Sequence, residues 1–499
     1  MAGLESELSG SPRVARRRRR ANIVATLGPA TSTFEQVRDL AEAGMDVARV
    51  NLAHGSHQEH RHLCELVHAA GVELGRPIAV MADVAGPKIR VGRFVDGGAI
   101  LHPGDRFVLT TELCDGTSSR VSTSYAALPD DVRPGDSILI DDGNIRLRVV
   151  AVSGRDVATE VVEGGRISDH KGLNLPGVGV SAPALSDEDV SALSNVLGCG
   201  VDLVALSFVR RPQDADAVRE VMVASGRLVP VIAKIEKPEV LSALPAIIDA
   251  FDGLMIARGD LGVEAPLEWV PLIQKRAINM ARARSRPVIV ATQMLESMIT
   301  HGRPTRAEAS DVANAIFEGA DAVMLSAETS VGAHPCETVA TMDRIIVAAE
   351  TNGHYPDVSS AEDGVPDSVA AAAVNLASRV TARALVAYTL SGRAAQLLAA
   401  RRPEIAVVAC TPDPGVGRQL AITWGIESIV VERVSTTDEM ITAIDTAIRA
   451  HGLARPGDRV VIVAGTPVGA DRATNTVRVH DVGSEETGLL RAGSDRHPG

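Results

Sequence analysis

Aromatic residues are scarce in this sequence, making up only 2% of its 499 residues. Aliphatic side chains must therefore fill the cores, and a hydrophobic content of 45% supplies enough of them. Long apolar runs are also missing, because nowhere do about 18 apolar residues follow one another as a membrane-spanning helix requires. We therefore expect a soluble cytoplasmic protein, and the length of 499 residues suggests about three domains.

Cysteines are few and form no recognisable pattern. There are five, an odd number, and no two of them stand in a C-x-x-C arrangement. Neither a disulfide framework nor a zinc cage is indicated, which agrees with a reducing compartment such as the cytosol.

Positive charge is in deficit, since Lys and Arg number 50 against 63 Asp and Glu, a net charge of −13. Such a chain offers no broad surface for nucleic acid or an anionic membrane, and neither is expected as a partner. The run Arg16–Arg20 is an exception. Because it stands alone beside the first apolar run, residues 1–20 are predicted to be a disordered basic leader.

Short β-branched apolar runs alternate with amphipathic stretches of helical length. About eight runs occur, the number of strands that closes a parallel barrel, and their near-continuous hydrophobicity is typical of strands covered on both faces. The sequence therefore predicts a (β/α)₈ TIM barrel over residues 21–90 and 172–350. The runs are Asn22–Thr26, Asp46–Asn51, Ile78–Asp83, Val201–Ser207, Val229–Ile235, Gly253–Arg258, Pro287–Thr292 and Asp321–Ser326.

Two further domains are predicted, one inserted within this pattern and one after it. About a hundred residues separate the third run from the fourth, far more than one crossover helix needs. Turn pairs such as Asp96-Gly97 and Pro134-Gly135 divide residues 91–171 into short strands, which predicts an inserted small β-barrel lid domain. A second series of strands and helices predicts a C-terminal α/β regulatory domain over 351–482, and the polar tail 483–499 is expected to be disordered.

Polar residues stand where the apolar runs end. In a (β/α)₈ barrel the C-terminal ends of the strands build the active site, and polar groups there have no packing role. The sequence thus predicts an active site on this face. The polar strand-end residues include Arg49, Asp83, Ser207, Glu236, Asp260, Thr292 and Ser326.

Three of these strand-end positions indicate a reaction. Glu236 and Asp260 follow neighbouring strands and can share Mg²⁺, which takes one or two carboxylates and leaves its other positions to water and substrate. Lys234 lies two residues before Glu236, so both side chains point to one face of the strand. An ammonium beside a metal suits a substrate whose negative charge moves, such as an enolate or a transferring phosphoryl group. A purely structural salt bridge is the alternative for Lys234.

Long and uncommon strings in the chain resemble those of pyruvate kinases. They are Ala-Thr-Gln-Met-Leu-Glu-Ser-Met at 291–298, Arg-Pro-Thr-Arg-Ala-Glu at 303–308 and Ser-Asp-Val-Ala-Asn-Ala at 310–315. The resemblance runs from Thr26 to Thr476 and so covers nearly the whole chain. It implies Mg²⁺-dependent phosphoryl transfer from phosphoenolpyruvate to ADP in glycolysis, giving pyruvate and ATP, with Mn²⁺ able to replace Mg²⁺. It also implies a homotetramer.

The resemblance implies roles at matching positions. Lys234 would neutralise the phosphoryl group and the developing enolate, while Arg49 would hold the transferring phosphate. Glu236 and Asp260 would be the magnesium ligands. The substrate carboxylate would meet Asp260, Thr292 and the amide of Gly259, and a water positioned by Thr292 and Ser326 would protonate the enolate. The nucleotide or its phosphates would contact Thr26, Pro29, Asn51, His54, Arg90 and Lys171.

The sequence departs from the family at its potassium site. Many members hold K⁺ through Asn-Phe-Ser-His-Gly and Asp-Thr-Lys-Gly-Pro-Glu, whereas residues 51–55 are Asn-Leu-Ala-His-Gly and residues 83–88 are Asp-Val-Ala-Gly-Pro-Lys. A subgroup with lysine in place of that glutamate works without K⁺. Because a fixed ammonium places one positive charge where K⁺ does, we predict that Lys88 replaces the ion beside Asn51 and Asp83.

A loop in the last domain is a candidate effector site. Residues 389–394, Thr-Leu-Ser-Gly-Arg-Ala, stand at a strand-to-helix junction, a geometry that binds anions. The matching loop of the family binds a sugar phosphate, but the lysine and serine typical of members regulated by fructose bisphosphate are replaced here. Ribose 5-phosphate, AMP or no effector at all remain open. The candidate residues are Thr389, Ser391, Gly392 and Arg393.

Two other functions remain open. One is a magnesium-dependent aldolase or lyase that acts through a pyruvate enolate, although such an enzyme has no nucleotide phosphates to hold with Arg49, Lys88 and Arg90. The other is a catalytically weak regulatory paralogue, which the presence of Lys234 and Glu236 disfavours.

Overall fold

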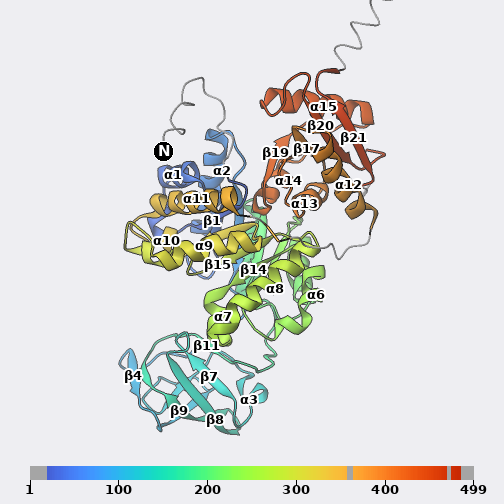
Figure 1. Ribbon diagram of the computed structural model, residues 1–499. Coiled ribbons are helices and arrows are strands. Elements are labelled where there is room, and N and C mark those ends of the chain that lie inside the picture. Colours follow the sequence, from blue (N-terminus) through green and yellow to red (C-terminus); the bar gives the residue numbers. More distant parts are fainter. Residues whose placement is uncertain (1–18, 354, 357–363, 469–473, 485–499) are drawn as a thin grey trace, which may run out of the picture.

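The computed structural model describes residues 19–353, 355–356, 364–468 and 474–484. Figure 1 shows three parts, with a barrel between an inserted sheet domain and a C-terminal α/β domain. Most of the predicted leader and tail, residues 1–18 and 485–499, lie outside the described residues.

Eight parallel strands close into the barrel, in the order β1-β16-β15-β14-β13-β12-β3-β2. This confirms the predicted fold class, and each predicted run overlaps one strand. Almost every residue of these strands is buried, and each strand therefore appears in the sequence as a continuous apolar run. The strands are β1 (Asn22–Thr26), β2 (Val47–Asn51), β3 (Ala79–Val84), β12 (Leu203–Leu206), β13 (Val231–Ile235), β14 (Gly253–Ala257), β15 (Val288–Ala291) and β16 (Ala322–Leu325).

Helices cover the outside of the barrel. Several begin at capping boxes, in which a Ser or Thr side chain accepts from the backbone N–H three residues on, as Ser56 does from Glu59 and Thr305 from Glu308. The helices are α1 (Phe34–Ala43), α2 (His57–Glu73), α4 (Asp187–Gly198), α5 (Asp214–Ala224), α6 (Val240–Ala250), α7 (Arg258–Glu264), α8 (Val270–Ala283), α9 (Arg306–Glu318), α10 (Ala327–Ser330) and α11 (Pro335–Asn352).

Four aspartates close the N-terminal end of the barrel. Each stands just before a strand and accepts a hydrogen bond from a backbone N–H of the neighbouring strand, at 2.9 or 3.0 Å, and each has an arginine within 4.0 Å. The barrel has eight neighbouring strand pairs, and the motif occurs at every second one, where it helps to fix the register. The pairs are Asp46 with Ile23, Asp202 with Val80, Asp252 with Val231 and Asp321 with Val288.

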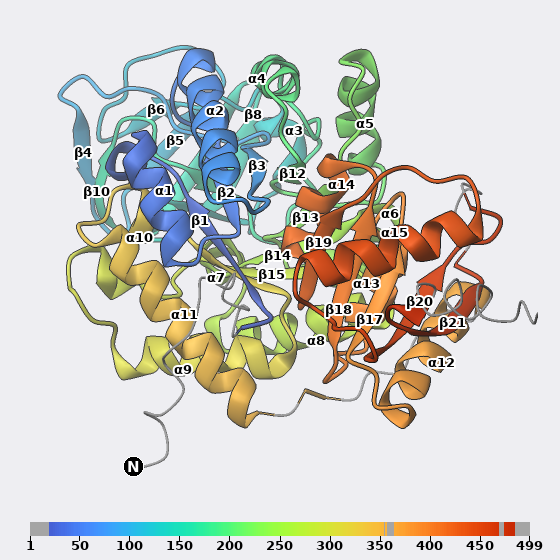
Figure 2. The same cartoon turned by 90° about the horizontal axis from the view of Figure 1, so that it is seen from above.

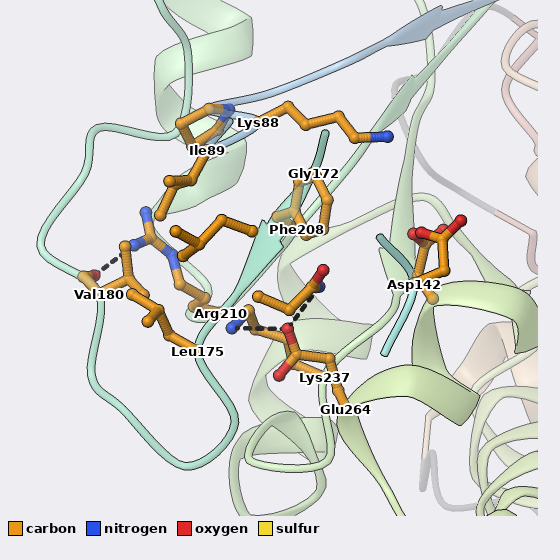
Figure 3. A pocket seen from close by; sticks show the side chains of 14 residues that line it. Lys88, Ile89, Asp142, Gly172, Leu175, Val180, Phe208, Arg210, Lys237 and Glu264 are labelled. Carbon is orange, nitrogen blue, oxygen red and sulfur yellow. Dashed lines mark hydrogen bonds and ion pairs between the residues drawn. The ribbon is translucent and has the colours of Figure 1, made fainter. Parts of the chain in front are cut away.

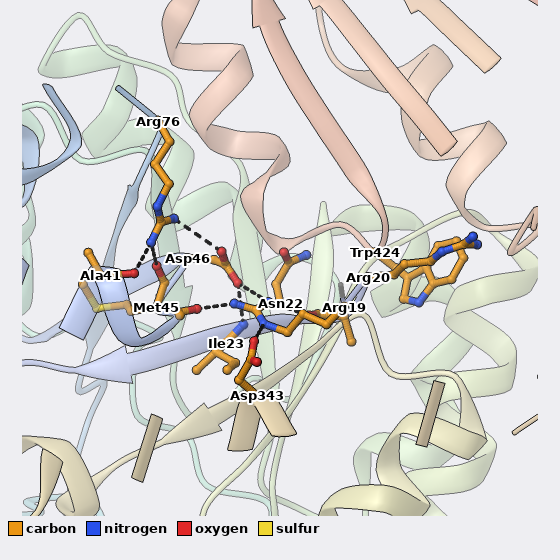
Figure 4. A network of polar contacts seen from close by, with 12 residues as sticks. Arg19, Arg20, Asn22, Ile23, Ala41, Met45, Asp46, Arg76, Asp343 and Trp424 are labelled. Carbon is orange, nitrogen blue, oxygen red and sulfur yellow. Dashed lines mark hydrogen bonds and ion pairs between the residues drawn. The ribbon is translucent and has the colours of Figure 1, made fainter. Parts of the chain in front are cut away.

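Arg19 and Arg20 are not part of a solvated leader, so that prediction was wrong for its last two residues. Arg19 is only 5% exposed and donates to Asp46 and Asp343, at 2.6 Å in each case (Figure 4). The guanidinium of Arg20 lies over the ring of Trp424, 5.0 Å from its centroid. A buried carboxylate such as Asp46 requires a partner charge, and the leader supplies it.

The inserted domain consists of two sheets and one helical turn, α3 (Leu128–Asp131). One sheet has the order β11-β7-β8-β9-β5-β6 and the other pairs β10 with β4. Closure of these strands into a small barrel stays a prediction. The strands are β4 (Gly98–Leu101), β5 (Arg106–Thr110), β6 (Arg120–Ser122), β7 (Ser137–Ile140), β8 (Ile145–Ser153), β9 (Asp156–Glu163), β10 (Gly165–Ser168) and β11 (Leu173–Asn174).

The C-terminal domain is a five-stranded sheet of order β19-β18-β17-β20-β21, with α12 and α13 packed on one face and α15 on the other (Figure 2). Only β21 runs antiparallel to its neighbour. The elements are β17 (Ala384–Tyr388), β18 (Ala406–Thr411), β19 (Ile426–Val430), β20 (Arg459–Ala464), β21 (Thr476–Asp481), α12 (Val365–Arg379), α13 (Arg393–Ala399), α14 (Pro414–Gln419) and α15 (Thr437–Ala450).

This domain docks on the aspartate end of the barrel. Ile422 is buried in the same apolar cluster as the inward-facing barrel residues Met81 and Met255. Arg418 donates to Asp202 at 2.8 Å, and Arg402 donates in the same way to Asp321 at 3.0 Å. The opposite end of the barrel, where the strands finish, is therefore left for the site.

Among the described residues, no helix has the length and apolarity needed to cross a membrane.

The contact of Arg19 with the barrel leads to a stability prediction. Arg19→Met should lower the free energy of unfolding by about 3 kcal/mol, because Asp46 stays buried without its nearest cation. Urea unfolding measures the change. The control is Arg38→Met, which breaks an exposed pair with Asp39 and should leave the stability nearly unchanged. An Arg19→Met protein as stable as the wild type would contradict the assignment.

Candidate active site

Lys234 lies at the centre of a buried polar cluster where the strands end. Its Nζ donates to Ser207 Oγ at 2.6 Å and lies 3.0 Å from Glu236 Oε1 and 3.2 Å from Asp83 Oδ1. These partners belong to the ends of three neighbouring strands, β12, β13 and β3. Lys234 therefore forms ion pairs with two carboxylates, which hold the ammonium at the strand-end face.

Asp83 joins Lys234 to a second cation. Its Oδ2 accepts from Arg49 Nε at 2.6 Å, and Arg49 also donates to Thr26 Oγ1 at 3.1 Å. Burial opposes ionisation of Asp83, but Arg49 and Lys234 outweigh it and hold its pKa below the usual range. Burial likewise opposes the charge of Lys234, yet Asp83 and Glu236 raise its pKa above the usual value. Lys234 therefore keeps its charge at neutral pH.

Glu236 and Asp260 are the candidate metal ligands. Burial raises the pKa of Glu236, and the charge of Asp260 adds to the rise while Lys234 opposes it. The second oxygen of Glu236 accepts from the Phe208 N–H at 2.7 Å, which fixes the carboxylate. Two hard oxygen donors suit Mg²⁺, since its other positions go to water and substrate. Among the described residues, no group of three or more His, Cys, Asp or Glu side chains forms a complete metal cage.

Thr292 and Gly259, to which the family resemblance gives a shared role at the substrate carboxylate, lie in contact. The Gly259 N–H donates to Thr292 Oγ1 at 2.7 Å, and Thr292 itself donates to Ala291 O at 2.6 Å. Thr292 and Gln293 have φ values of 68° and 54°. Such left-handed conformations cost about 1–3 kcal/mol each for residues other than glycine and cluster at functional sites.

The long string that carries the family resemblance is held by carboxylates. Glu308 accepts from the N–H of Ser297 and the N–H of Thr305, at 2.7 Å in each case. Burial opposes ionisation of Glu308, but these hydrogen bonds hold its pKa below the usual value. Arg258 pairs with Asp311 at 2.6 Å. The string thus supports the loop that carries Thr292.

Ser326 stands at the end of β16, next to the strand that leads to Thr292. Its N–H donates to Glu328 Oε2 at 2.6 Å, and the other oxygen of Glu328 accepts from the N–H of Leu295. The hydroxyl of Ser326 is buried and has no hydrogen-bond partner among the described residues. Its hydrogen-bonding capacity is thus unused by the described residues.

The predicted nucleotide residues stand on three segments of the chain. Thr26 belongs to the Arg49 contact, and the exposed Pro29 follows it on the same chain segment. Asn51 and His54 form the turn after β2. Two further residues mark where the chain enters and leaves the insertion: Arg90 donates to His170 O at 3.0 Å, and Lys171 pairs with Asp141 at 2.7 Å.

Lys88 lies at the edge of this region. Asn51 and Asp83 are register partners on β2 and β3, as a shared site requires. Both oxygens of Asp83 are already in contact with Arg49 and Lys234, however, and the exposed Lys88 side chain extends past Gly172. The structure does not bring Lys88 into contact with Asp83.

A pocket lies between the barrel mouth and the insertion (Figure 3). Its lining combines residues of both parts, with several charged side chains among them. Because Asp260 is one of them, the pocket opens onto the candidate metal site. Its charged lining residues are Lys88, Asp142, Arg210, Lys237, Asp260 and Glu264.

The candidate effector loop is separate from this site. Thr389 Oγ1 accepts from the Gly392 N–H at 2.9 Å, which closes the loop on itself. Arg393 was expected to face an effector, but its guanidinium donates to Ser285 O at 2.9 Å, on the barrel. The carbonyls at the C-terminal end of a helix need hydrogen-bond donors from outside the helix. Arg393 is such a donor for the carbonyl of Ser285, just beyond the end of α8. Arg393 is therefore a domain contact.

Sequence reasoning did not assign roles to Ser207 or Glu328. Ser207 is one of the polar strand-end residues named from the sequence, and Glu328 follows another of them, Ser326, by two positions. Their partners, Lys234 for the first and two backbone N–H groups for the second, become visible only in three dimensions. The sequence could show that a polar residue ends each strand, but it could not show which group that residue contacts.

Comparisons of the chain with known proteins match pyruvate kinases over nearly its whole length. The family model described as pyruvate kinase, barrel domain, matches residues 18–339, and the one described as pyruvate kinase, alpha/beta domain, matches residues 367–480. The pyruvate kinase of Mycobacterium tuberculosis is 50% identical over 469 residues, 94% of this chain and 99% of the relative. That of Corynebacterium glutamicum is 49% identical over 467 residues, 94% and 98% of the two chains. A crystal structure of a pyruvate kinase from Cryptosporidium parvum has a TM-score of 0.86 at 33% identity, covering 93% of this chain and 96% of that chain.

Glu308 leads to a prediction on pH. Its folded-state pKa lies below the unfolded value of about 4.3, so its contribution is present above that value and is lost as pH falls through the folded pKa. Glu308→Gln should therefore destabilise the protein by about 2 kcal/mol, and by the same amount from about pH 8 to about pH 5. Urea unfolding at several pH values is the measurement. If the difference in unfolding free energy between the wild type and Glu308→Gln shrinks within this pH interval, then Glu308 titrates there and burial governs its pKa.

Proposed function

Because the chain belongs to the pyruvate kinase family, we propose that it transfers the phosphoryl group of phosphoenolpyruvate to ADP, giving pyruvate and ATP, as a cytoplasmic step of glycolysis with Mg²⁺ or Mn²⁺. The observation that carries this proposal is the buried Lys234, held charged at the strand ends with Glu236 and Asp260 beside it. A fixed cation in a water-poor site stabilises negative charge that develops during a reaction.

The residues then take distinct parts in the reaction. Glu236 and Asp260 would hold the divalent metal, which supplies a Lewis acid for the substrate oxygens. Lys234 stabilises the charge that passes from the phosphoryl group to the enolate oxygen. Arg49, oriented by Asp83, holds the phosphate during its transfer.

Protonation of the enolate carbon completes the reaction. Neither Thr292 nor Ser326 is acidic enough to give up a proton by itself, since both carry ordinary hydroxyls. We propose that they position a water that delivers the proton. The buried hydroxyl of Ser326, which has no partner among the described residues, supports this role.

An independence from K⁺ is part of the proposal. It is supported by two changes in the sequence, Ala53 where the family has a serine ligand and Lys88 where it has a glutamate. Since Lys88 is exposed and does not touch Asp83, its ammonium would reach the phosphates of a bound nucleotide from the lid side.

Assembly and regulation stay proposals. A homotetramer is supported by exposed apolar side chains at the start of α8, where Leu267, Trp269 and Leu272 stand close in sequence. A phosphorylated effector at Thr389, Ser391 and Gly392 rests on the resemblance alone, because the loop is closed on itself and Arg393 faces the barrel.

The activity is tested by coupling pyruvate formation to lactate dehydrogenase, with phosphoenolpyruvate, ADP and Mg²⁺ supplied. The wild type should form pyruvate, and Lys234→Met should lose at least about 10²-fold to 10³-fold in kcat, the cost of removing one charge-stabilising group. Lys275→Met, which removes an exposed lysine of α8, should retain activity. No pyruvate above the Lys234→Met background would eliminate the proposal and favour the lyase or the weak paralogue.

The monovalent cation requirement is tested in the same assay. Replacing Tris or another large cation by K⁺ at constant ionic strength should leave the wild-type rate nearly unchanged. Lys88→Glu should lower the rate, and K⁺ should restore part of it, because the ion can then supply the missing charge. Strong activation of the wild type by K⁺ would refute the role of Lys88.

A further inference from the structure

Lys237 and Glu264 form a buried ion pair beside the proposed metal site. Their Nζ and Oε1 atoms are 3.4 Å apart, and the two residues are 8% and 6% exposed. Lys237 directly follows Glu236, and Glu264 ends α7, the helix whose first turn carries Asp260. The pair therefore joins the two segments that present the two candidate ligands (Figure 3).

The same carboxylate also reaches the insertion. Asn174 Nδ2 donates to Glu264 Oε1 at 2.8 Å, and Asn174 belongs to β11, which pairs with β7 in the sheet of the insertion. The other oxygen of Glu264 is buried without a hydrogen-bond partner among the described residues. Glu264 is thus a point where the barrel, α7 and the insertion meet.

The position of α7 depends on contacts of this kind. The helix has seven residues, too few to be stable alone, so tertiary contacts must hold it. At its first turn, the hydrogen bond from Gly259 to Thr292 is one such contact. At its last residue, Glu264 binds Lys237 and Asn174. Without the second anchor, the turn with Asp260 could shift relative to Glu236.

Stability alone does not account for the pair. A buried ion pair costs much desolvation, and apolar residues of similar volume often serve stability as well or better. Its position between two ligand-bearing segments gives it another role. Residues that orient metal ligands from behind typically contribute about 10-fold to 100-fold to metal affinity.

We propose that Lys237 and Glu264 are positioning residues that keep Glu236 and Asp260 at the spacing a shared divalent cation needs, and that Asn174 ties this spacing to the insertion. The proposal rests on the proposed function, since Glu236 and Asp260 must be the metal ligands for it to hold.

The test is the affinity of the full-length protein for Mn²⁺, measured from the electron paramagnetic resonance signal of the free ion. The variants are Lys237→Met, Glu264→Gln and the double variant. If the pair fixes geometry, each of the three should bind Mn²⁺ about 10-fold or more weakly. The kcat at saturating Mn²⁺ should stay close to the wild-type value, because occupancy rather than chemistry is lost.

The double variant separates geometry from charge. If the pair acted only through charge, Lys237→Met would bind Mn²⁺ more tightly, Glu264→Gln more weakly, and the double variant like the wild type. That result would overturn the proposal. Lys237→Gln is the milder variant should Lys237→Met fail to fold; weaker binding supports the proposal and tighter or unchanged binding contradicts it.

Two controls complete the design. Arg418→Met breaks a partly buried pair with Asp202 at the far end of the barrel, so it should lower the melting temperature without changing Mn²⁺ affinity. A loss of affinity there as large as in the Lys237 variants would mean that general destabilisation explains the effect. If the wild type neither binds Mn²⁺ nor forms pyruvate, the proposed function fails. If it does both and the three variants match it, the positioning role alone fails.

Discussion

The site depends on one buried ammonium and the carboxylates that keep it charged. Lys234 would lose its proton easily if burial acted alone, and Asp83 and Glu236 reverse that effect. Asp83 can do so because Arg49 shares it, so one carboxylate serves two cations. Since these groups come from the ends of neighbouring strands, the closed barrel itself sets their distances. The permanent positive charge is therefore a property of the fold, prepared before any substrate arrives.

The opposite end of the barrel is closed by the same principle. Four aspartates there each bind a backbone N–H of a neighbouring strand and an arginine. Arg19 of the N-terminal segment, and Arg402 and Arg418 of the C-terminal domain, supply three of the cations. Segments far apart in sequence thus stabilise the strand starts, while the strand ends stay open to the pocket beneath the insertion. The molecule separates its structural charges from its candidate catalytic charges.

The sequence predicted the barrel and the site face well because both leave local patterns. Strands buried on both faces are continuous apolar runs, and the polar residues that end them, such as Glu236 and Thr292, have no packing role there. Pairings between distant residues leave no such pattern. Arg19 meets Asp343 across 324 positions, and Arg393 binds a carbonyl of the barrel rather than an effector. For Ser207, the sequence predicted the position at a strand end, but it did not predict the hydrogen bond that Ser207 accepts from Lys234.

The central claim is that a charged Lys234 stabilises an enolate, and exchange of the methyl protons of pyruvate tests it most directly. In D₂O with a divalent metal and ATP present, proton NMR should show the wild type replacing these protons by deuterium, because each passage through the enolate releases one. Lys234→Met should not accelerate the exchange above the rate without enzyme. An equal rate in both proteins, or none in the wild type, would contradict the account.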